Sequence, residues 1–295
     1  MKSNPILLVI LAFIVAACSG ATVSPSTAVQ TSGSVSASAP PSSTPPSRAP
    51  ASSTPPSSAP IELTIYAAAS LRGAMEEAKA AYETANPGTT LVVSIDSSSA
   101  LATQIQQGAP ADLFLSADTT NPQKLADAGL ADGAPVTFAR NGLTIIVPAA
   151  NPAGIASPAD LARTGVRVIA AGDEVPITKY AAQLIGNLAK EAGYPADFAA
   201  AYAANVASKE DNVQAVVAKI ELDEGDAGIV YVTDARASAK VATIDVPPSA
   251  DVPATYDALV INGAANPGAA RSFLTWLTGP DGQAILSRLG FLPPS

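Results

Sequence analysis

From residue 61 onward, apolar side chains follow two spacings in turn. Residues 61–66 (Ile-Glu-Leu-Thr-Ile-Tyr) alternate apolar and polar side chains, which predicts a strand, and apolar side chains then recur at helical spacing through 71–82. The sequence Asn86-Pro87-Gly88 ends this helix. The order then repeats, with strands at 91–93 and 112–115, a short helix at 101–105 and a helix around 124–125. Strands that alternate with helices in this way predict a mainly parallel sheet with helices on both faces.

The pattern resumes in the second half of the chain. It predicts strands at 143–148, 166–169, 227–231 and 256–261, and helices at 177–191, 212–221 and 269–289, the last interrupted at Pro280. We therefore predict the α/β class for residues 61–295. This length suffices for one large domain or for two lobes.

The N-terminus has the pattern of an export signal. Lys2 precedes an uncharged apolar run over 6–17, which is too short for a stable membrane-spanning helix and has the length of the apolar part of a signal peptide. The run ends in Val15-Ala16-Ala17-Cys18, which resembles a bacterial lipobox. The resemblance implies removal of residues 1–17 and acylation of Cys18, and an ordinary signal peptide that contains a cysteine is the alternative.

A stretch of different composition follows the signal. Residues 19–60 consist mostly of Ser, Thr, Pro and Ala, with Arg48 as the only charged residue. Such a composition has too few large apolar side chains to form a core. We therefore predict that residues 18–60 form a disordered or polyproline-like tether, which could reach about 130 Å when fully extended.

Composition and charge exclude several classes of function. The chain of 295 residues has no histidine and a single cysteine, which excludes histidine-dependent triads, imidazole metal ligands, an internal disulfide and a thiolate metal cluster. Its 25 acidic and 16 basic side chains give a net charge of −9. A negative balance of this kind is unfavourable for binding nucleic acid, so we expect no nucleic-acid partner.

Three stretches together carry a family resemblance. They are 66–71 (Tyr-Ala-Ala-Ala-Ser-Leu), 97–114 (from Ser-Ser-Ser-Ala-Leu to Gly-Ala-Pro-Ala-Asp-Leu-Phe) and 226–231 (Asp-Ala-Gly-Ile-Val-Tyr). The closing Gly290-Phe291 adds to them. In order and spacing, this set resembles the molybdate-binding proteins of molybdate ABC importers over essentially all of 61–295.

The resemblance implies a fold and a function. The fold is a two-lobed periplasmic-binding-protein fold of type II, with a mainly parallel, helix-flanked sheet in each lobe and the ligand in the cleft. Lobe 1 would comprise 61–140 and 251–295, and lobe 2 would comprise 141–250. The implied function is the capture of molybdate, and of tungstate, for delivery to an ABC permease. No cofactor and no catalysis are implied, and we expect a monomer lipid-anchored to the extracytoplasmic side of the cell membrane.

Five residues match the family's ligand-binding positions. The resemblance implies that Ser70 and Ser98 donate through their hydroxyls, Ile177 and Val213 through backbone N–H groups at helix starts, and Tyr231 through its phenol. Four helix N-termini, each carrying about +0.5 elementary charge, would sum to about +2 and match a dianion without lysine or arginine. The plainer alternative for Ser70 is a helix cap. For Ile177, Val213 and Tyr231 it is a side chain buried in the core.

The motif at 175–180 departs from the family's pattern, and the carboxylate of Asp96 bears on the choice of anion. The family's Val-Pro-Ala-Gly-x-Tyr reads Val-Pro-Ile-Thr-Lys-Tyr at 175–180, so Ile177 is bulkier than the expected alanine and Thr178 replaces glycine. Asp96 places a carboxylate two residues before Ser98, and we expect it to cap its helix and face away from the anion. We expect the neighbouring Ser97 and Ser99 to serve in the turn or in capping.

Other functions stay open at the level of sequence. Another oxyanion, sulfate or phosphate, is the first alternative. An exported serine hydrolase with Ser70 as nucleophile is the second, although the chain contains no Ser-x-x-Lys or Gly-x-Ser-x-Gly motif. A lipid-tethered adhesion module without a ligand is the third.

Overall fold

The computed structural model describes residues 60–294. The predicted signal peptide, Cys18 and the tether up to residue 59 lie outside the described residues. Among the residues that are described, no helix combines the length and the apolar character needed to cross a membrane.

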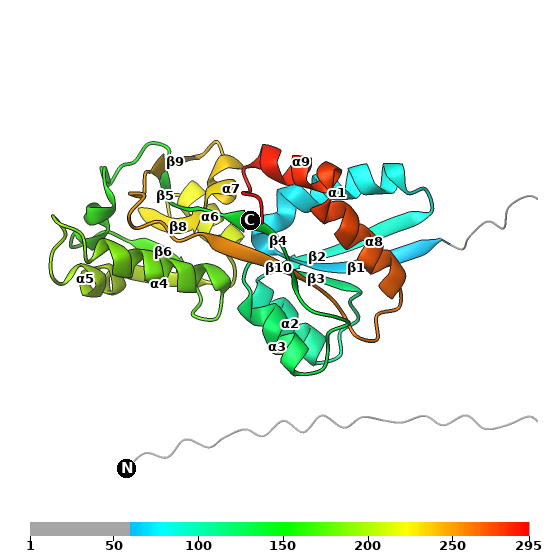
Figure 1. Cartoon of the computed structure of the whole chain (residues 1–295). Coiled ribbons are helices and arrows are strands. Elements are labelled where there is room, and N and C mark those ends of the chain that lie inside the picture. Colours follow the sequence, from blue (N-terminus) through cyan, green and yellow to red (C-terminus); the bar gives the residue numbers. More distant parts are fainter. Residues whose placement is uncertain (1–59, 295) are drawn as a thin grey trace, which may run out of the picture. The chain divides into compact units, whose positions relative to one another are not determined.

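A five-stranded sheet forms the core of what we term the first lobe (Figure 1). Its spatial order is β2-β1-β3-β10-β4, made of β1 (Ile61–Ala68), β2 (Thr89–Asp96), β3 (Leu113–Ser116), β4 (Val136–Asn141) and β10 (Ala254–Val260). Strand β1 pairs in parallel with β2 and β3, whereas β10 runs antiparallel to β3 and β4. The helical elements of this lobe are η1 (Ala69–Leu71), α1 (Arg72–Ala85), α2 (Ser98–Gln106), α3 (Thr120–Asp127), α8 (Pro267–Thr278) and α9 (Pro280–Leu289).

The second lobe repeats this architecture around another five-stranded sheet. Its spatial order is β7-β6-β8-β5-β9, made of β5 (Leu143–Pro148), β6 (Val168–Ala171), β7 (Val206–Glu210), β8 (Ala227–Tyr231) and β9 (Val241–Ile244). Strand β6 pairs in parallel with β7 and β8, and β5 runs antiparallel to β8 and β9. Its helical elements are η2 (Pro158–Ala162), α4 (Pro176–Leu188), α5 (Phe198–Ala204), α6 (Val213–Glu221) and α7 (Val232–Arg236).

The chain passes between the sheets twice. It leaves the first sheet after Asn141, enters the second at Leu143, and returns between Ile244 and Ala254 (Figure 1). The predicted two-lobed α/β fold is confirmed. The prediction of a mainly parallel sheet in each lobe is wrong, because two of the four strand pairings in each sheet are antiparallel and both sheets are mixed. The exact residues at which one lobe ends and the other begins, 140 and 250, stay a prediction.

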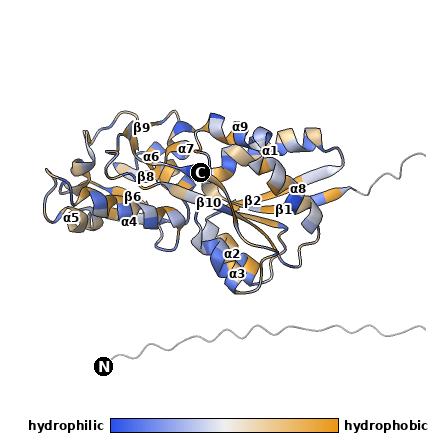
Figure 2. Cartoon of the chain, in the orientation of Figure 1, coloured by the Kyte–Doolittle hydropathy of each residue, from blue (hydrophilic) through white to orange (hydrophobic). Residues whose placement is uncertain are grey.

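Helix packing fixes where the helix starts lie. Figure 2 shows apolar colour on parts of the central strands and both apolar and polar colours on the helices that cover them. In α1 the buried side chains are Ala74, Met75, Ala78 and Tyr82, which are the positions that helical spacing predicts. In β8, an added Cβ at Gly228 would lie 2.9 Å from Val216 Cγ1, so the absence of a side chain lets α6 pack closely on the sheet.

Pattern reading predicted the central strands and the long helices but missed the peripheral elements. Strands β4, β7 and β9 and helices α5 and α7 were not predicted. In β7, all five residues are only partly buried or exposed, because it is an edge strand with no buried face along its length. The predicted interruption of the C-terminal helical segment at Pro280 is confirmed. Helix α8 ends at Thr278 and Pro280 begins α9, a first-turn position that proline favours.

Candidate functional site

The five predicted site residues line a single cavity between the lobes. This interlobe cavity is lined by Ser70, Ser98, Ile177, Val213 and Tyr231 together with Ala68, Ala69, Ser97, Ala117, Val175 and Pro176. Every one of these segments lies at or after the carboxyl end of a strand of its sheet. In α/β folds, ligands bind at the carboxyl ends of the strands because the connecting loops and helix starts meet there.

Ser70 lies in the short helix η1, directly after β1. Its hydroxyl shares a 2.9 Å hydrogen bond with the hydroxyl of Tyr256 and makes no capping bond to its helix, so the interpretation as a plain helix cap is wrong. Burial raises the pKa of Tyr256 well above its ordinary value. Tyr256 therefore stays neutral, and the Ser70 hydroxyl is held at the edge of the cavity by a neutral partner.

Ser98 is the first residue of α2 and is almost fully buried. The Ser98 Oγ accepts a 3.0 Å hydrogen bond from the backbone N–H of Ala117, so its own hydrogen is left to donate. The predicted capping role of Ser97 is confirmed, because its Oγ accepts from the backbone N–H of Ala100. Ser98 is thereby free of the capping task.

The second lobe contributes two helix starts. Val213 is the first residue of α6, behind the N-cap Asn212, whose side chain accepts from the backbone N–H of Ala215. Ile177 is the second residue of α4, behind Pro176. Backbone N–H groups in the first turn of a helix have no partner within the helix, so those of Ile177 and Val213 are available at the cavity. Both side chains are buried, in agreement with the interpretation as core aliphatics.

The replacement of glycine by Thr178 has a local structural reason. The Thr178 hydroxyl donates to the backbone carbonyls of Gly172 and Ala171, at 2.8 and 3.0 Å. These bonds fix the first turn of α4 to the end of β6. The substitution therefore holds the helix start in place.

Tyr231 ends β8, and its side chain is buried. Among the described residues, its hydroxyl has no hydrogen-bond partner. Burial raises its pKa well above the ordinary value, so the hydroxyl keeps its proton and can donate. A buried polar group without a partner costs about 1–3 kcal/mol, which indicates that this hydroxyl has a function beyond the packing of its ring.

The cavity offers donors and no charge. Its lining consists of alanine, serine, valine, proline, isoleucine and tyrosine, and it contains no carboxylate, lysine or arginine. Helix N-termini add partial positive charge and free N–H groups. Such a set suits an anion that is fully deprotonated, because the lining offers no carboxylate to accept a proton that the anion carries.

The expectation for Asp96 is half wrong. Asp96 does not line the interlobe cavity, but neither does it cap α2, because Ser97 holds that position. Its Oδ1 accepts from the backbone N–H of Ser97 at 2.7 Å and from the side-chain amide of Asn212 at 3.3 Å. The carboxylate therefore contacts the opposite lobe.

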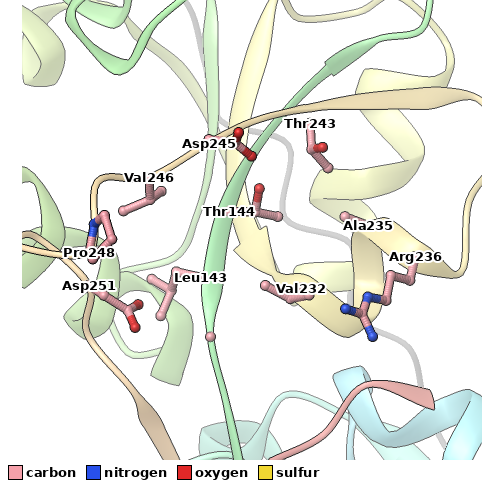
Figure 3. Close-up of a pocket in the computed structure, with 11 residues that line it drawn as sticks. Leu143, Thr144, Val232, Ala235, Arg236, Thr243, Asp245, Val246, Pro248 and Asp251 are labelled. Carbon is pink, nitrogen blue, oxygen red and sulfur yellow. The ribbon is translucent and has the colours of Figure 1, made fainter. Parts of the chain in front are cut away.

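A larger pocket lies elsewhere and contains none of the predicted site residues. It has a volume of about 480 Å³ and is lined by residues of β5, α7, β9 and the segment that follows β9. Figure 3 shows Arg236 on one side of it, apart from the carboxylates of Asp245 and Asp251. Among the described residues, no group of three acidic side chains could hold a metal ion.

Sequence reasoning missed three buried residues that support the site. Tyr256 bonds to Ser70, and Asn141 donates from its side chain to Thr233 at 2.8 Å, which joins the two lobes. Asp234 accepts from the backbone N–H of Tyr231 and from the side chain of Gln214. No local pattern distinguishes these residues, because each depends on partners that the fold brings together.

The chain matches known proteins over its described part. Residues 63–292 match the family model of the bacterial extracellular solute-binding proteins. The molybdate-binding protein ModA of Mycobacterium tuberculosis is 35% identical over 233 residues, which cover 79% of this chain and 85% of that protein.

Solved structures agree on the fold. The periplasmic molybdate-binding protein of Azotobacter vinelandii matches with a TM-score of 0.68 and 24% identity, over 79% of this chain and 100% of that one. The sulfate-binding protein SubI of Mycobacterium tuberculosis matches with a TM-score of 0.70 and 21% identity, over 79% of this chain and 87% of that one. The sequence match, the two-lobed fold and the cavity between the lobes agree, and the chain belongs to the bacterial extracellular solute-binding proteins.

Proposed function

We propose that this protein captures molybdate, and also tungstate, outside the cytoplasm and delivers it to the permease of an ABC importer. The observation that carries the proposal is the buried hydroxyl of Tyr231, which has no partner among the described residues and lines a cavity with hydrogen-bond donors. A tetrahedral oxyanion would accept from this hydroxyl, from the two serines and from the two helix starts. The relationship to molybdate-binding proteins supports the choice of ion.

The donors come from both lobes. Ser70 and Ser98 belong to the first lobe, and Ile177, Val213 and Tyr231 belong to the second. A bound ion would therefore bridge the lobes and favour closure of the cleft, as ligands do in hinged two-lobed proteins. Release to the permease would require the lobes to separate again.

The absence of a carboxylate among the described residues of the cavity lining bears on selectivity. Phosphate near pH 7 carries a proton, and leaving that proton unmatched in a buried site costs about 1–3 kcal/mol. Sulfate has no proton, and the fold is also that of a sulfate-binding protein, so the fold alone does not choose the ion. We propose that sulfate binds more weakly because its shorter bonds do not reach donors spaced for a larger ion.

Competition calorimetry tests this proposal. The wild-type protein is titrated with molybdate, tungstate, sulfate and phosphate at one pH and ionic strength. We expect tight one-to-one binding of molybdate and tungstate, weaker binding of sulfate and the weakest binding of phosphate. Sulfate or phosphate binding more tightly than molybdate would show that the assigned ligand is wrong.

Tyr231→Phe should have opposite effects on stability and binding. Removing a buried hydroxyl without a partner should raise the free energy of unfolding of the ligand-free protein by about 1 kcal/mol. Losing a donor to a charged ligand should weaken molybdate binding by about tenfold. Thermal unfolding and calorimetry measure the two effects.

Tyr256→Phe is the matched control, because the hydroxyl of this buried tyrosine has a partner in Ser70. Its loss should lower stability. If Tyr231→Phe lowers the stability of the ligand-free protein and leaves the affinity unchanged, its hydroxyl does not bind the anion.

Family membership places the protein outside the cytoplasm. We further propose that Cys18 is acylated and anchors a monomer to the cell membrane, since the lipobox-like sequence ends at this residue. Cys18→Ser should move the protein from the membrane fraction to the soluble fraction without changing its affinity for molybdate. Membrane association that persists in this variant would contradict the anchor.

We propose that the protein is not an enzyme. A serine nucleophile needs an adjacent base, and the hydrogen-bond partner of the Ser70 hydroxyl is the neutral Tyr256. The described residues that line the interlobe cavity include no lysine, aspartate or glutamate. Asp234 lines a neighbouring pocket with Ser70, but its carboxylate accepts from Gln214 and from the backbone N–H of Tyr231 rather than from Ser70. Hydrolysis of a chromogenic ester that is lost in Ser70→Ala would contradict this proposal.

A further inference from the structure

We propose that Asp96 and Asn212 form a latch across the cleft, which keeps the lobes closed over the bound anion and sets how slowly the anion leaves. The latch is the hydrogen bond from the side-chain amide of Asn212 to Oδ1 of Asp96, with an N–O distance of 3.3 Å. Its two residues are 116 positions apart and belong to different lobes. This inference rests on the proposed function, because it concerns the residence time of the anion.

The latch lies next to the anion donors on both sides. Asp96 precedes the cavity-lining Ser97, and Asn212 precedes the cavity-lining Val213. Each latch residue is also tied to its own lobe: Asp96 accepts from the backbone N–H of Ser97, and Asn212 caps α6 through Ala215. The bond therefore couples the start of α2 to the start of α6, and both helix starts line the interlobe cavity.

The chemistry of the pair requires an amide at position 212. The Asn212 side chain uses its oxygen to cap α6 and its nitrogen to reach Asp96. An aspartate there would cap the helix equally well but could not donate. The substitution therefore separates loss of the latch from loss of the cap. It also places a second carboxylate against Asp96.

The surroundings leave Asp96 dependent on this donor. The open part of the cleft that Asp96 lines also contains Asp173, Glu174, Glu210 and Asp211. The single lysine in this lining, Lys209, pairs with Asp173 at 2.5 Å. In the described structure, the Asn212 amide is the side-chain donor that Asp96 has from the opposite lobe.

Reversing the pair tests the latch. Three full-length proteins are compared: wild type, Asn212→Asp, and the double variant Asp96→Asn with Asn212→Asp. The double variant keeps an acceptor at 212 for the α6 cap and supplies a donor at 96, so it can form the same bond in the opposite direction. The dissociation rate is measured by chasing bound radiolabelled molybdate with excess unlabelled molybdate, and the association rate is measured separately.

We expect Asn212→Asp to release molybdate about tenfold faster, as the loss of a hydrogen bond to a charged group would produce, with an association rate within about twofold of wild type. The double variant should return the dissociation rate to near the wild-type value. A double variant that releases molybdate as fast as the single variant, or a single variant that releases it at the wild-type rate, overturns the latch. Equal thermal midpoints of the ligand-free proteins show that folding is not the cause.

If the wild-type protein binds none of the tested anions, the proposed function is wrong. The latch is then tested by comparing the ligand-free forms of the three proteins. Small-angle scattering should then give a larger radius of gyration for Asn212→Asp than for wild type, and the double variant should restore the smaller radius. Equal radii in all three proteins would overturn the latch as well.

Discussion

Replacing Val213 with proline should weaken molybdate binding by about a hundredfold while α6 stays intact, because the lost backbone N–H is a donor to a buried charged ligand. Val213 is the first residue of α6, where proline is favoured and no intrahelical hydrogen bond is lost. The preceding Asn212 has a φ of −156° and a ψ of 171°, an extended conformation of the kind that residues before proline adopt. Calorimetry measures the change in affinity.

Val213→Ala is the matched control, because it removes side-chain atoms and keeps the N–H. We expect its affinity for molybdate to stay within about twofold of wild type, since alanine retains the donor. Circular dichroism of both variants checks that the fold is retained. Equal affinities in the proline and alanine variants would show that the start of α6 does not donate to the anion.

Folding stability should fall as the pH rises from about 4 to about 7, and Asp234 should be the main cause. Burial raises the pKa of Asp234 from 3.8 to about 7, although the backbone N–H of Tyr231 and the side chain of Gln214 donate to it and act in the opposite direction. In this range the unfolded chain loses the proton before the folded protein does, so deprotonation favours unfolding. A shift of about three units corresponds to about 4 kcal/mol, which makes this a large effect for one side chain.

Urea unfolding of wild type and Asp234→Asn at pH 5 and pH 8 measures this effect. The wild-type protein should lose several kcal/mol between the two conditions, and the variant should lose much less. Asp257→Asn is the control: burial also raises the pKa of Asp257, but this residue is less deeply buried and should account for a smaller part of the slope. Equal pH dependence in wild type and Asp234→Asn would contradict the role of Asp234.

The sequence predicts the fold where periodicity reflects burial. Helix α1 buries the side chains that helical spacing selects, and β1 is the strand that alternation indicates. Edge strands are not predicted, because a partly exposed strand lacks the regular alternation of apolar and polar side chains, as in β7. The short helix α7 follows directly from Tyr231 at the end of β8, where no apolar period of its own can develop.

The site could be predicted only as a set of positions. Strand-to-helix junctions locate the serines and the helix starts, and the fold brings these junctions together at the carboxyl ends of the strands. The partners of the site residues could not be predicted. Ser70 bonds to Tyr256, 186 positions away, and Asp96 bonds to Asn212 across the cleft, so each contact depends on the packing of the whole chain.

A crystal structure of the full chain with molybdate, with the molybdenum located by anomalous scattering, tests the central claim most directly. We predict a single strong peak in the interlobe cavity, with the oxygens of the ion within hydrogen-bond distance of the Ser70, Ser98 and Tyr231 hydroxyls and of the backbone nitrogens of Ile177 and Val213. A peak in the larger pocket beside Arg236 instead, or a filled interlobe cavity in which Tyr231 makes no bond to the ion, would contradict the site that we propose.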